Sequence, residues 1–529
     1  MKRRWLALAG FTCLLYGTDS STDGKRWWSH ILYLADDKLE GRLTGSEGYR
    51  KAAIYVAGEF ERACLKPGGT SGYFQPVKFK SREIVEEGSS LALERNGAKE
   101  ALRLGEDATI SMRVDPAVSV EAPLAFVGYG LTVPELKFDD LAGQDLRGKI
   151  AVYMSGGPSS IPGALSSHYQ SAEERGVFLE RAGVVGTCAI ANPAAMDVPW
   201  ARSALARFQP AMSLNYPELD KSFGLHISVT INPSHLDKWL AGSGHTADEI
   251  LALAKERKPL PHFSLDARLK AKTEERRTEV ESPNVIAILP GTDPKLKDEY
   301  VVLSAHLDHL GVGRPINGDS IYNGAMDDAS GVATLLDIAE QLHEAKPKLR
   351  RSLIFVTVAA EEKGLLGSKY FATNPTVKRE QIVADLNVDM FLPLFPFHIL
   401  TVYGLDESDL GRQVRAVADP LGIRIQRDLE PERNIFIRSD QYNFIRQGVP
   451  SLFFKVGYEK GSPEEGIAKK WLKERYHAPS DDVNQPVDLK AAADFNRMML
   501  LLAETVANQT ARPQWDQDSF FRRFAKNGD

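Results

Sequence analysis

The sequence predicts an α/β fold: a mixed, mostly parallel sheet sandwiched by helices, with a β-rich insertion. Three observations support this prediction. Apolar strand-like runs alternate with helical runs after Ser282-Pro283, which is typical of parallel sheets. Polar, chemically active residues follow several of these runs. Residues 118–262 differ, because short β-type runs are separated there by Gly, Pro and Asp-Asp turns.

The N-terminal part begins with helices. Residues 26–42 and 48–69 have helical periodicity, and the second stretch ends at Pro67-Gly68-Gly69, a stop signal. Within the β-rich segment, residues 171–186 predict one helix. The charged residues 265–280 predict a connector or an exposed strand.

The second half of the chain supplies the alternating pattern. Strands are predicted for the apolar runs at 284–291, 299–306, 351–360, 382–390 and 451–457. Helices are predicted at 329–346, 364–374 and 489–509. From these changes in texture we expect six segments: 1–20, a signal peptide or N-terminal anchor; 27–117, the N-terminal part of the main domain; 118–262, an insert; 263–281, a connector; 282–510, the larger part of the main domain; and 511–529, a tail.

Composition and the N-terminus limit the function classes. A net charge of −6 with both signs interspersed gives no basic face for nucleic acid. Lys2-Arg3-Arg4 precedes the apolar residues 5–16, which resembles a secretory signal and is too short to span a bilayer. We therefore expect export to a periplasm or the extracellular space. No clear cleavage site follows, so membrane attachment through an uncleaved segment stays open.

Cysteine usage gives a separate constraint. The chain has three cysteines, one of them within the apolar N-terminal stretch, and this number excludes a disulfide framework. Cys64 and Cys188 can be two buried thiols or one bridge, and the first interpretation is favoured because free cysteine is commonly a core residue.

Candidate functional residues stand at the ends of the predicted strands. Five positions in the second half carry them: His306 with Asp308, Asp327, Glu361 with Glu362, Asp389, and His477. Sites in doubly wound sheets form outside the carboxyl ends of the strands, so these side chains are expected to meet. Mixed imidazole and carboxylate ligands suit zinc or another divalent ion, and cobalt or manganese stays possible.

Each of these residues also has a structural interpretation. Asp328 can cap the following helix, Glu361 and Glu362 can face the positive end of a helix dipole, and His477 can be a turn residue. The set as a whole favours a metal site, because five coincidences at strand ends of one domain are hard to explain structurally.

The motifs that carry these residues resemble a known family. In order, "SAHLDHLG", "NGAMDDASGVA", "AAEEKGLLGS", "NVDMF" and "YHAPSDD" are similar to metallopeptidase family twenty-eight, the co-catalytic zinc aminopeptidases. The similarity covers roughly residues 282–510. The middle stretch, which contains "FVGYGLTVPELKFDDLAGQDLRGKIAVYMSGGP", resembles the protease-associated domain often inserted in such enzymes.

The resemblance implies two zinc ions per monomer bridged by Asp327. It implies His306 and Asp389 on one zinc, Glu362 and His477 on the other, and Glu361 as the general base. Asp308 is placed to accept the second ring N–H of His306 and fix its tautomer.

The expected activity is hydrolysis of N-terminal residues from peptide substrates. A carboxypeptidase or dipeptidase of the same fold is the alternative, and a glutaminyl cyclase or a non-catalytic receptor-like relative is a further one. Tyr442, in "IRSDQYNF", can assist an oxyanion or be a buried structural residue. Side-chain preference and oligomeric state do not follow from the sequence.

Overall fold

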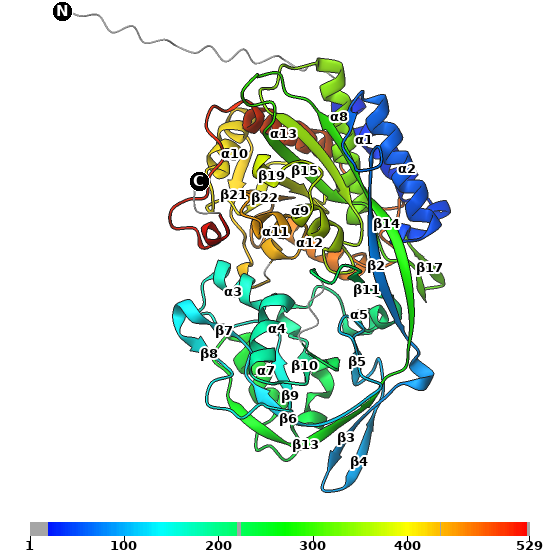
Figure 1. Cartoon of the computed structure of the whole chain (residues 1–529), viewed down its shortest axis with the longest axis vertical. Coiled ribbons are helices and arrows are strands. Elements are labelled where there is room, and N and C mark those ends of the chain that lie inside the picture. Colours follow the sequence, from blue (N-terminus) through cyan, green and yellow to red (C-terminus); the bar gives the residue numbers. More distant parts are fainter. Residues whose placement is uncertain (1–19, 220–223, 434, 526–529) are drawn as a thin grey trace, which may run out of the picture.

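The computed structural model describes residues 20–219, 224–433 and 435–525, which form two units stacked along the long axis of the molecule (Figure 1). Two long antiparallel strands, β2 (Phe74–Ile84) and β14 (Glu275–Leu289), pair over their length and connect the units. No helix within these ranges has both the length and the apolar composition needed to cross a bilayer. The expected signal or anchor at residues 1–20 lies outside the described residues, apart from Ser20.

The larger unit is built on a ten-stranded mixed sheet. Its central strands β18, β15, β19 and β22 are parallel neighbours, whereas β14 and β20 flank them in antiparallel pairing. The sheet order is β11 (Ala211–Leu214), β2, β14, β18 (Ser352–Val358), β15 (Tyr300–His306), β19 (Ile382–Val388), β22 (Ser451–Val456), β20 (Ile399–Tyr403) and β21 (Arg424–Gln426), with β1 (Lys66–Pro67) on β14. The mixed α/β class is confirmed, with the parallel part at its centre.

Helices cover both faces of this sheet. Val301 and Leu303 of β15 face one core and Val302 faces the other, because neighbouring strand residues point to opposite faces. One core contains residues of α1 (Ser20–Leu34), α2 (Glu47–Arg62), α8 (Ser330–Ala345), α10 (Leu410–Ala418), α12 (Pro463–Glu474) and α13 (Leu489–Asn508). The opposite core contains residues of α9 (Leu366–Thr373) and α11 (Gln441–Ile445). Burial on both faces explains why the central strands read as continuous apolar runs.

The smaller unit has its own eight-stranded sheet and its own apolar core. The order is β4 (Ala98–Leu102), β3 (Ser90–Arg95), β13 (His262–Lys272), β6 (Ser119–Val127), β9 (Ile150–Met154), β10 (Gly186–Ile190), β12 (Ser228–Ile231) and β5 (Ala108–Ile110). Its helices are α3 (Gly163–Gln170), α4 (Ala172–Arg181), α5 (Trp200–Ser203), α6 (Leu236–Leu240) and α7 (Ala247–Lys255). Two short hairpins complete the described strands: β7 (Thr132–Val133) with β8 (Phe138–Asp139), and β16 (Gly311–Ile316) with β17 (Asp319–Tyr322).

This sheet extends beyond the expected insert at 118–262. Strands β3, β4 and β5 precede those limits and β13 follows them, so sheet membership places the limits near residues 90 and 272 instead. The expected connector at 263–281 is likewise mostly strand, in β13 and the start of β14. Of the two expectations for residues 265–280, the exposed strand agrees with the structure. Charged residues alternate with buried ones along β13, because one face of this strand is solvated.

Both described cysteines are free thiols. Cys188 is buried in β10 as expected, but Cys64 is exposed, so the expectation of two buried thiols was wrong for it. Cys64 follows the end of α2 with a φ of +56°, where the chain turns at the surface.

Candidate metal centre

Three neighbouring parallel strands end at one place and carry four of the expected residues there. His306 is the last residue of β15, Glu361 and Glu362 follow β18, and Asp389 follows β19. The sheet order β18-β15-β19 makes these strand ends adjacent. Parallel strands present their carboxyl ends at the same sheet edge, so the side chains meet although they are far apart in sequence.

Two further expected residues, Asp327 and His477, come from the connections over this edge. Asp327 lies in the irregular turn Ala325–Ala329 immediately before α8. His477 lies in the loop after α12, and its own φ is +53°. Ala360, immediately before Glu361, and Met390, immediately after Asp389, also have positive φ. A non-glycine residue in this region costs about 1–3 kcal/mol, and such residues concentrate at functional sites.

Asp327 stands between two groups of imidazole and carboxylate. Its Oδ1 lies 3.1 Å from His306 Nε2, and that ring nitrogen lies 3.7 Å from Asp389 Oδ1. Its Oδ2 lies 3.3 Å from His477 Nε2, which lies 3.2 Å from Glu362 Oε2. One carboxylate therefore faces two sets of donors with its two oxygens, as expected for a bridging ligand.

The donor set fits divalent cations. Asp327 Oδ2 and Glu362 Oε1 are buried, and an imidazole nitrogen lies near each of them: His477 Nε2 at 3.3 Å and His309 Nδ1 at 2.9 Å. Neither contact has hydrogen-bond geometry, and His309 Nε2 is likewise buried without a partner among the described residues. Buried orphaned oxygens and nitrogens are costly unless a ligand binds them. Nitrogen and carboxylate oxygen donors at this spacing suit zinc.

The adjacent carboxylates Glu361 and Glu362 have opposite electrostatic environments. Burial, together with the neighbouring charges of Glu362 and Asp389, raises the pKa of Glu361 well above its ordinary value. Burial also raises the pKa of Glu362, but His477 and His309 outweigh it and hold that pKa well below the ordinary value. Two neighbouring titratable groups with pKa values driven apart are a sign of separate roles in acid–base chemistry.

Asp308 is in place, but its contact with His306 differs from the expectation. His306 Nδ1 lies 3.0 Å from the backbone carbonyl oxygen of Asp308 and 4.0 Å from its carboxylate. The carboxylate instead accepts the backbone N–H of Glu361 at 3.0 Å. The backbone carbonyl is thus the partner that can fix the His306 tautomer, because it is the closer acceptor, and the side chain positions the strand end that carries Glu361.

Three residues at the site were not among the expected set. His309 Nδ1 lies 2.9 Å from Glu362 Oε1. Asp481 accepts the backbone N–H groups of Met326 and Asp327, at 2.9 and 3.1 Å. Both residues lie inside the quoted motifs, "HLDH" and "YHAPSDD", and this proximity was the available signal.

Asp328 is the third of these residues, and its hydrogen bonds agree with the interpretation that it caps the following helix. Its Oδ1 accepts the N–H of Gly331, in the first turn of α8, at 2.8 Å and that of Met390 at 3.0 Å. Its Oδ2 accepts the N–H of His306 at 3.3 Å. Because both oxygens are engaged by backbone donors, Asp328 ties together the segments that carry His306 and Asp389.

A fully buried arginine from the N-terminal segment holds the loops of the site. Arg42 donates hydrogen bonds to the carbonyl oxygens of Leu307, at 2.9 Å, Asn323, at 2.6 Å, and Gly324, at 2.9 Å. The first carbonyl directly follows His306 and the other two precede the turn with Asp327. Burial lowers the pKa of Arg42 to about 10, although four neighbouring aspartates, Asp327 among them, act in the opposite direction.

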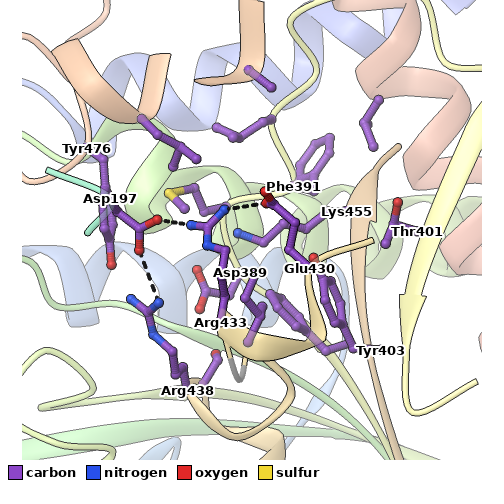
Figure 2. A pocket seen from close by; sticks show the side chains of 18 of the residues that line it. Asp197, Asp389, Phe391, Thr401, Tyr403, Glu430, Arg433, Arg438, Lys455 and Tyr476 are labelled. Atoms are coloured by element: carbon purple, nitrogen blue, oxygen red, sulfur yellow. Dashed lines mark hydrogen bonds and ion pairs between the residues drawn. The ribbon is translucent and has the colours of Figure 1, made fainter. Parts of the chain in front are cut away.

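A pocket opens beside the three strand ends (Figure 2). Asp327, Glu361 and Asp389 of the centre line it, together with apolar side chains such as Phe391 and Phe453. Asp197 of the smaller unit reaches this pocket and forms ion pairs with Arg433 and Arg438 of the larger unit. Both units therefore contribute to the space next to the metal centre.

Tyr442 is a structural residue rather than a member of the centre. Its ring is buried, and its hydroxyl lies 2.9 Å from Nδ1 of His168 in the smaller unit. Burial raises the pKa of Tyr442 to about 12. Tyr442 thus contacts the other unit. Of its two expected roles, assistance to an oxyanion and a buried structural role, the structure agrees with the second.

Comparison with known sequences identifies the larger unit. Residues 284–503 match the family model "Peptidase family M28". The chain is 29% identical to aminopeptidase Y of Saccharomyces cerevisiae over 222 residues, which is 39% of this chain and 35% of that protein. It is 30% identical to leupeptin-inactivating enzyme 1 of Streptomyces exfoliatus over 191 residues, or 36% of this chain and 39% of that protein. The chain thus spans well under half the length of these relatives.

Comparison with solved structures supports the architecture over nearly the whole chain. The aminopeptidase from Aneurinibacillus sp. strain AM-1 superposes with a TM-score of 0.57. The superposition covers 93% of this chain and 95% of that chain at 19% identity. At this identity the likeness establishes a shared fold that includes both units.

Proposed function

Because residues 284–503 belong to peptidase family M28, we propose that the chain is a zinc-dependent exopeptidase that removes N-terminal residues from peptides. One observation carries the proposal. The two oxygens of Asp327 face separate imidazole–carboxylate groups, each with its own histidine and its own second acid. This is the arrangement that a pair of bridged cations requires.

Two zinc ions would be held by five side chains. His306 and Asp389 would bind one ion, Glu362 and His477 the other, and Asp327 both. The orphaned oxygens of Asp327 and Glu362 support this assignment. Bound zinc supplies polarisation of the scissile carbonyl and lowers the pKa of an attacking water.

Glu361 is the general base in this proposal. Its side chain lines the pocket and is not needed as a ligand. It would take a proton from the attacking water and deliver it to the leaving amine. Asp308 holds the Glu361 backbone through the 3.0 Å hydrogen bond, which fixes where the base stands.

The smaller unit would be a protease-associated domain that shapes access to the centre. Asp197 supports this role, because it reaches the pocket and pairs with Arg433 and Arg438. Export to the periplasm or the extracellular space rests on Lys2-Arg3-Arg4 and the apolar residues 5–16.

The test combines metal content with substrate polarity. We would measure zinc per monomer and assay aminoacyl p-nitroanilides, N-acetylated counterparts and C-terminally susceptible peptides. Glu361→Gln is compared with Glu344→Gln, an exposed residue of α8. We expect about two zinc ions, cleavage that needs a free α-amine, and loss of turnover with retained zinc only in Glu361→Gln.

Other outcomes would change or end the proposal. Cleavage of C-terminal residues alone would retain the zinc chemistry and make the enzyme a carboxypeptidase. Absence of stoichiometric metal, or unchanged turnover in Glu361→Gln, would contradict the proposed mechanism.

A further inference from the structure

The pocket beside the metal centre contains one lysine that the proposed mechanism does not use. Lys455 lies on β22, and its antiparallel partner on β20 is Thr401. The neighbouring pair on the same strands is Tyr403 and Phe453. Because residues two apart on a strand share a face, all four side chains project from one face of the sheet, and all four line the pocket. Lys455 therefore projects from the sheet into the pocket (Figure 2).

The other charged side chains of the outer pocket are already engaged. Arg433 and Arg438 pair with Asp197, and Glu430 pairs with Arg433 at 2.9 Å. Asp428 accepts the backbone N–H of Glu430 at 2.8 Å. These acids and bases thus compensate one another or bind backbone donors, and they leave little capacity to bind a ligand ionically.

Lys455 differs from them. No carboxylate among the described residues forms an ion pair with its ammonium group, and its nearest recorded partner is the ring of Phe453, 5.4 Å from Nζ to the centroid. Burial lowers the pKa of Lys455, whereas the charges of Asp389 and Asp327 act in the opposite direction. Asp389 and Asp327 act on the ammonium without a direct ion pair, and in the zinc-loaded enzyme their charges would be taken up by the metal. Binding of an anion beside this cation on an apolar wall is therefore favourable.

We propose that Lys455 binds a carboxylate of the substrate, and that the enzyme prefers peptides whose N-terminal residue is glutamate or aspartate. This inference rests on the proposed function. In an aminopeptidase the α-amine and the scissile carbonyl lie at the metal centre, so the first side chain enters the adjoining pocket. That pocket is lined both by Asp327, Glu361 and Asp389 of the centre and by Lys455. The aliphatic part of such a side chain would pack on the apolar wall, while its carboxylate meets the ammonium.

The same ammonium could receive the α-carboxylate of a dipeptide, and the experiment separates the two sources. Zinc-loaded wild type, Lys455→Met and the control Lys470→Met, an exposed lysine of α12, are assayed with Glu-, Asp-, Leu- and Lys-p-nitroanilide. None of these substrates carries an α-carboxylate. Alanyl-alanine and alanyl-alanine amide form the second arm, because they differ only in the α-carboxylate.

We expect wild type and Lys470→Met to prefer the Glu and Asp substrates by at least about tenfold in kcat/KM. Lys455→Met should lose about 100-fold on those two substrates, while its rate on Leu-p-nitroanilide stays within about threefold. The ratio within one variant is the deciding quantity, so a loss of folded protein, which lowers all rates together, does not imitate the effect. Lys455→Arg should retain most of the acidic preference, since it keeps the charge.

Three results would overturn the inference. The first is cleavage of all p-nitroanilides by wild type with a preference for Leu or Lys. The second is an equal loss of all rates in Lys455→Met with the fold intact. The third is a response to the substitution by alanyl-alanine alone, which would assign the α-carboxylate instead. Failure of every aminoacyl substrate, with C-terminal cleavage retained, would contradict the aminopeptidase proposal itself and is thereby distinguished from these results.

Discussion

The metal centre and the pocket beside it lie at the same edge of the large sheet, but they are assembled differently. The centre contains acids and histidines from the ends of adjacent strands and from two connecting loops. Its paired imidazole nitrogens and carboxylate oxygens lie 2.9–3.9 Å apart. The pocket gathers its charges from β22, from the loop before α11, and from Asp197 of the other unit. The two ion pairs of Asp197, with Arg433 and Arg438, join side chains that are more than 200 residues apart in sequence.

The difference indicates which part is fixed and which part is adaptable. Side chains hold the backbone of the centre: Asp328 and Asp481 accept backbone N–H groups, and Arg42 donates to backbone carbonyl oxygens. The pocket is held mainly by side-chain ion pairs, some of them partly exposed, and such pairs contribute little to stability. Substitutions at the centre should therefore affect chemistry and folding strongly, whereas those in the pocket should change selectivity.

The largest effect is expected for the shared carboxylate. Asp327→Asn removes the charge that faces both donor groups, so both cations should bind weakly and kcat should fall by about 1,000-fold or more. Zinc analysis after dialysis and steady-state kinetics measure the two effects, with the exposed Asp419→Asn as control. Full zinc content together with normal turnover would show that Asp327 is not a bridging ligand.

Removal of the buried arginine is expected to be nearly as severe, through stability. Arg42→Met leaves carbonyl oxygens of the two loops without donors and removes a cation from among buried aspartates. We expect a loss of about 3–5 kcal/mol in the free energy of unfolding, by analogy with the breaking of other buried charged networks. Urea unfolding monitored by tryptophan fluorescence gives this value, and the exposed Arg497→Met should change little. A loss below about 1 kcal/mol in the free energy of unfolding would show that the two loops keep their conformation without Arg42.

A moderate effect is expected for the histidine that contacts Glu362. His309→Ala removes the nitrogen 2.9 Å from Glu362 Oε1, so zinc affinity should fall by about 10–100-fold, while kcat at saturating zinc stays near that of wild type. Competition with a chelating dye measures the affinity, with His398→Ala at an exposed position as control. A large loss of kcat at full zinc occupancy would instead place His309 in the chemistry.

The smallest effect is expected at the contact between the units. Asp197→Asn breaks the ion pairs with Arg433 and Arg438, and KM for aminoacyl substrates should change by up to about fivefold with kcat unchanged. Initial-rate kinetics measure this, and the exposed Asp248→Asn in α7 serves as control. Inactivation by Asp197→Asn would remove the distinction between a fixed centre and an adaptable pocket.

Much of the centre was predictable because the relevant signals are local. Apolar runs that end in His306, Glu361 and Asp389 identify strands with polar termini, and parallel pairing brings such termini together. The prediction that the Asp308 carboxylate accepts the second ring N–H of His306 was wrong, because the backbone carbonyl lies closer to that nitrogen. Spacing along the chain does not tell which of the two oxygens is the nearer one. The limits of the insert were too narrow for a related reason: strand pairing of β3 and β13 depends on partners distant in sequence.

The α/β class, the strand-end residues and the family resemblance follow from the amino-acid sequence alone, since each depends on short motifs and on hydrophobic periodicity. The support of the centre by Arg42 and His309 could be seen only in the folded chain. The same holds for the position of Lys455 opposite Thr401, in a pocket that Asp197 also lines. Those relations arise from which strands pair and how two units pack. Strand pairing and the packing of the two units depend on residues far apart in the chain, so a local sequence pattern does not predict them.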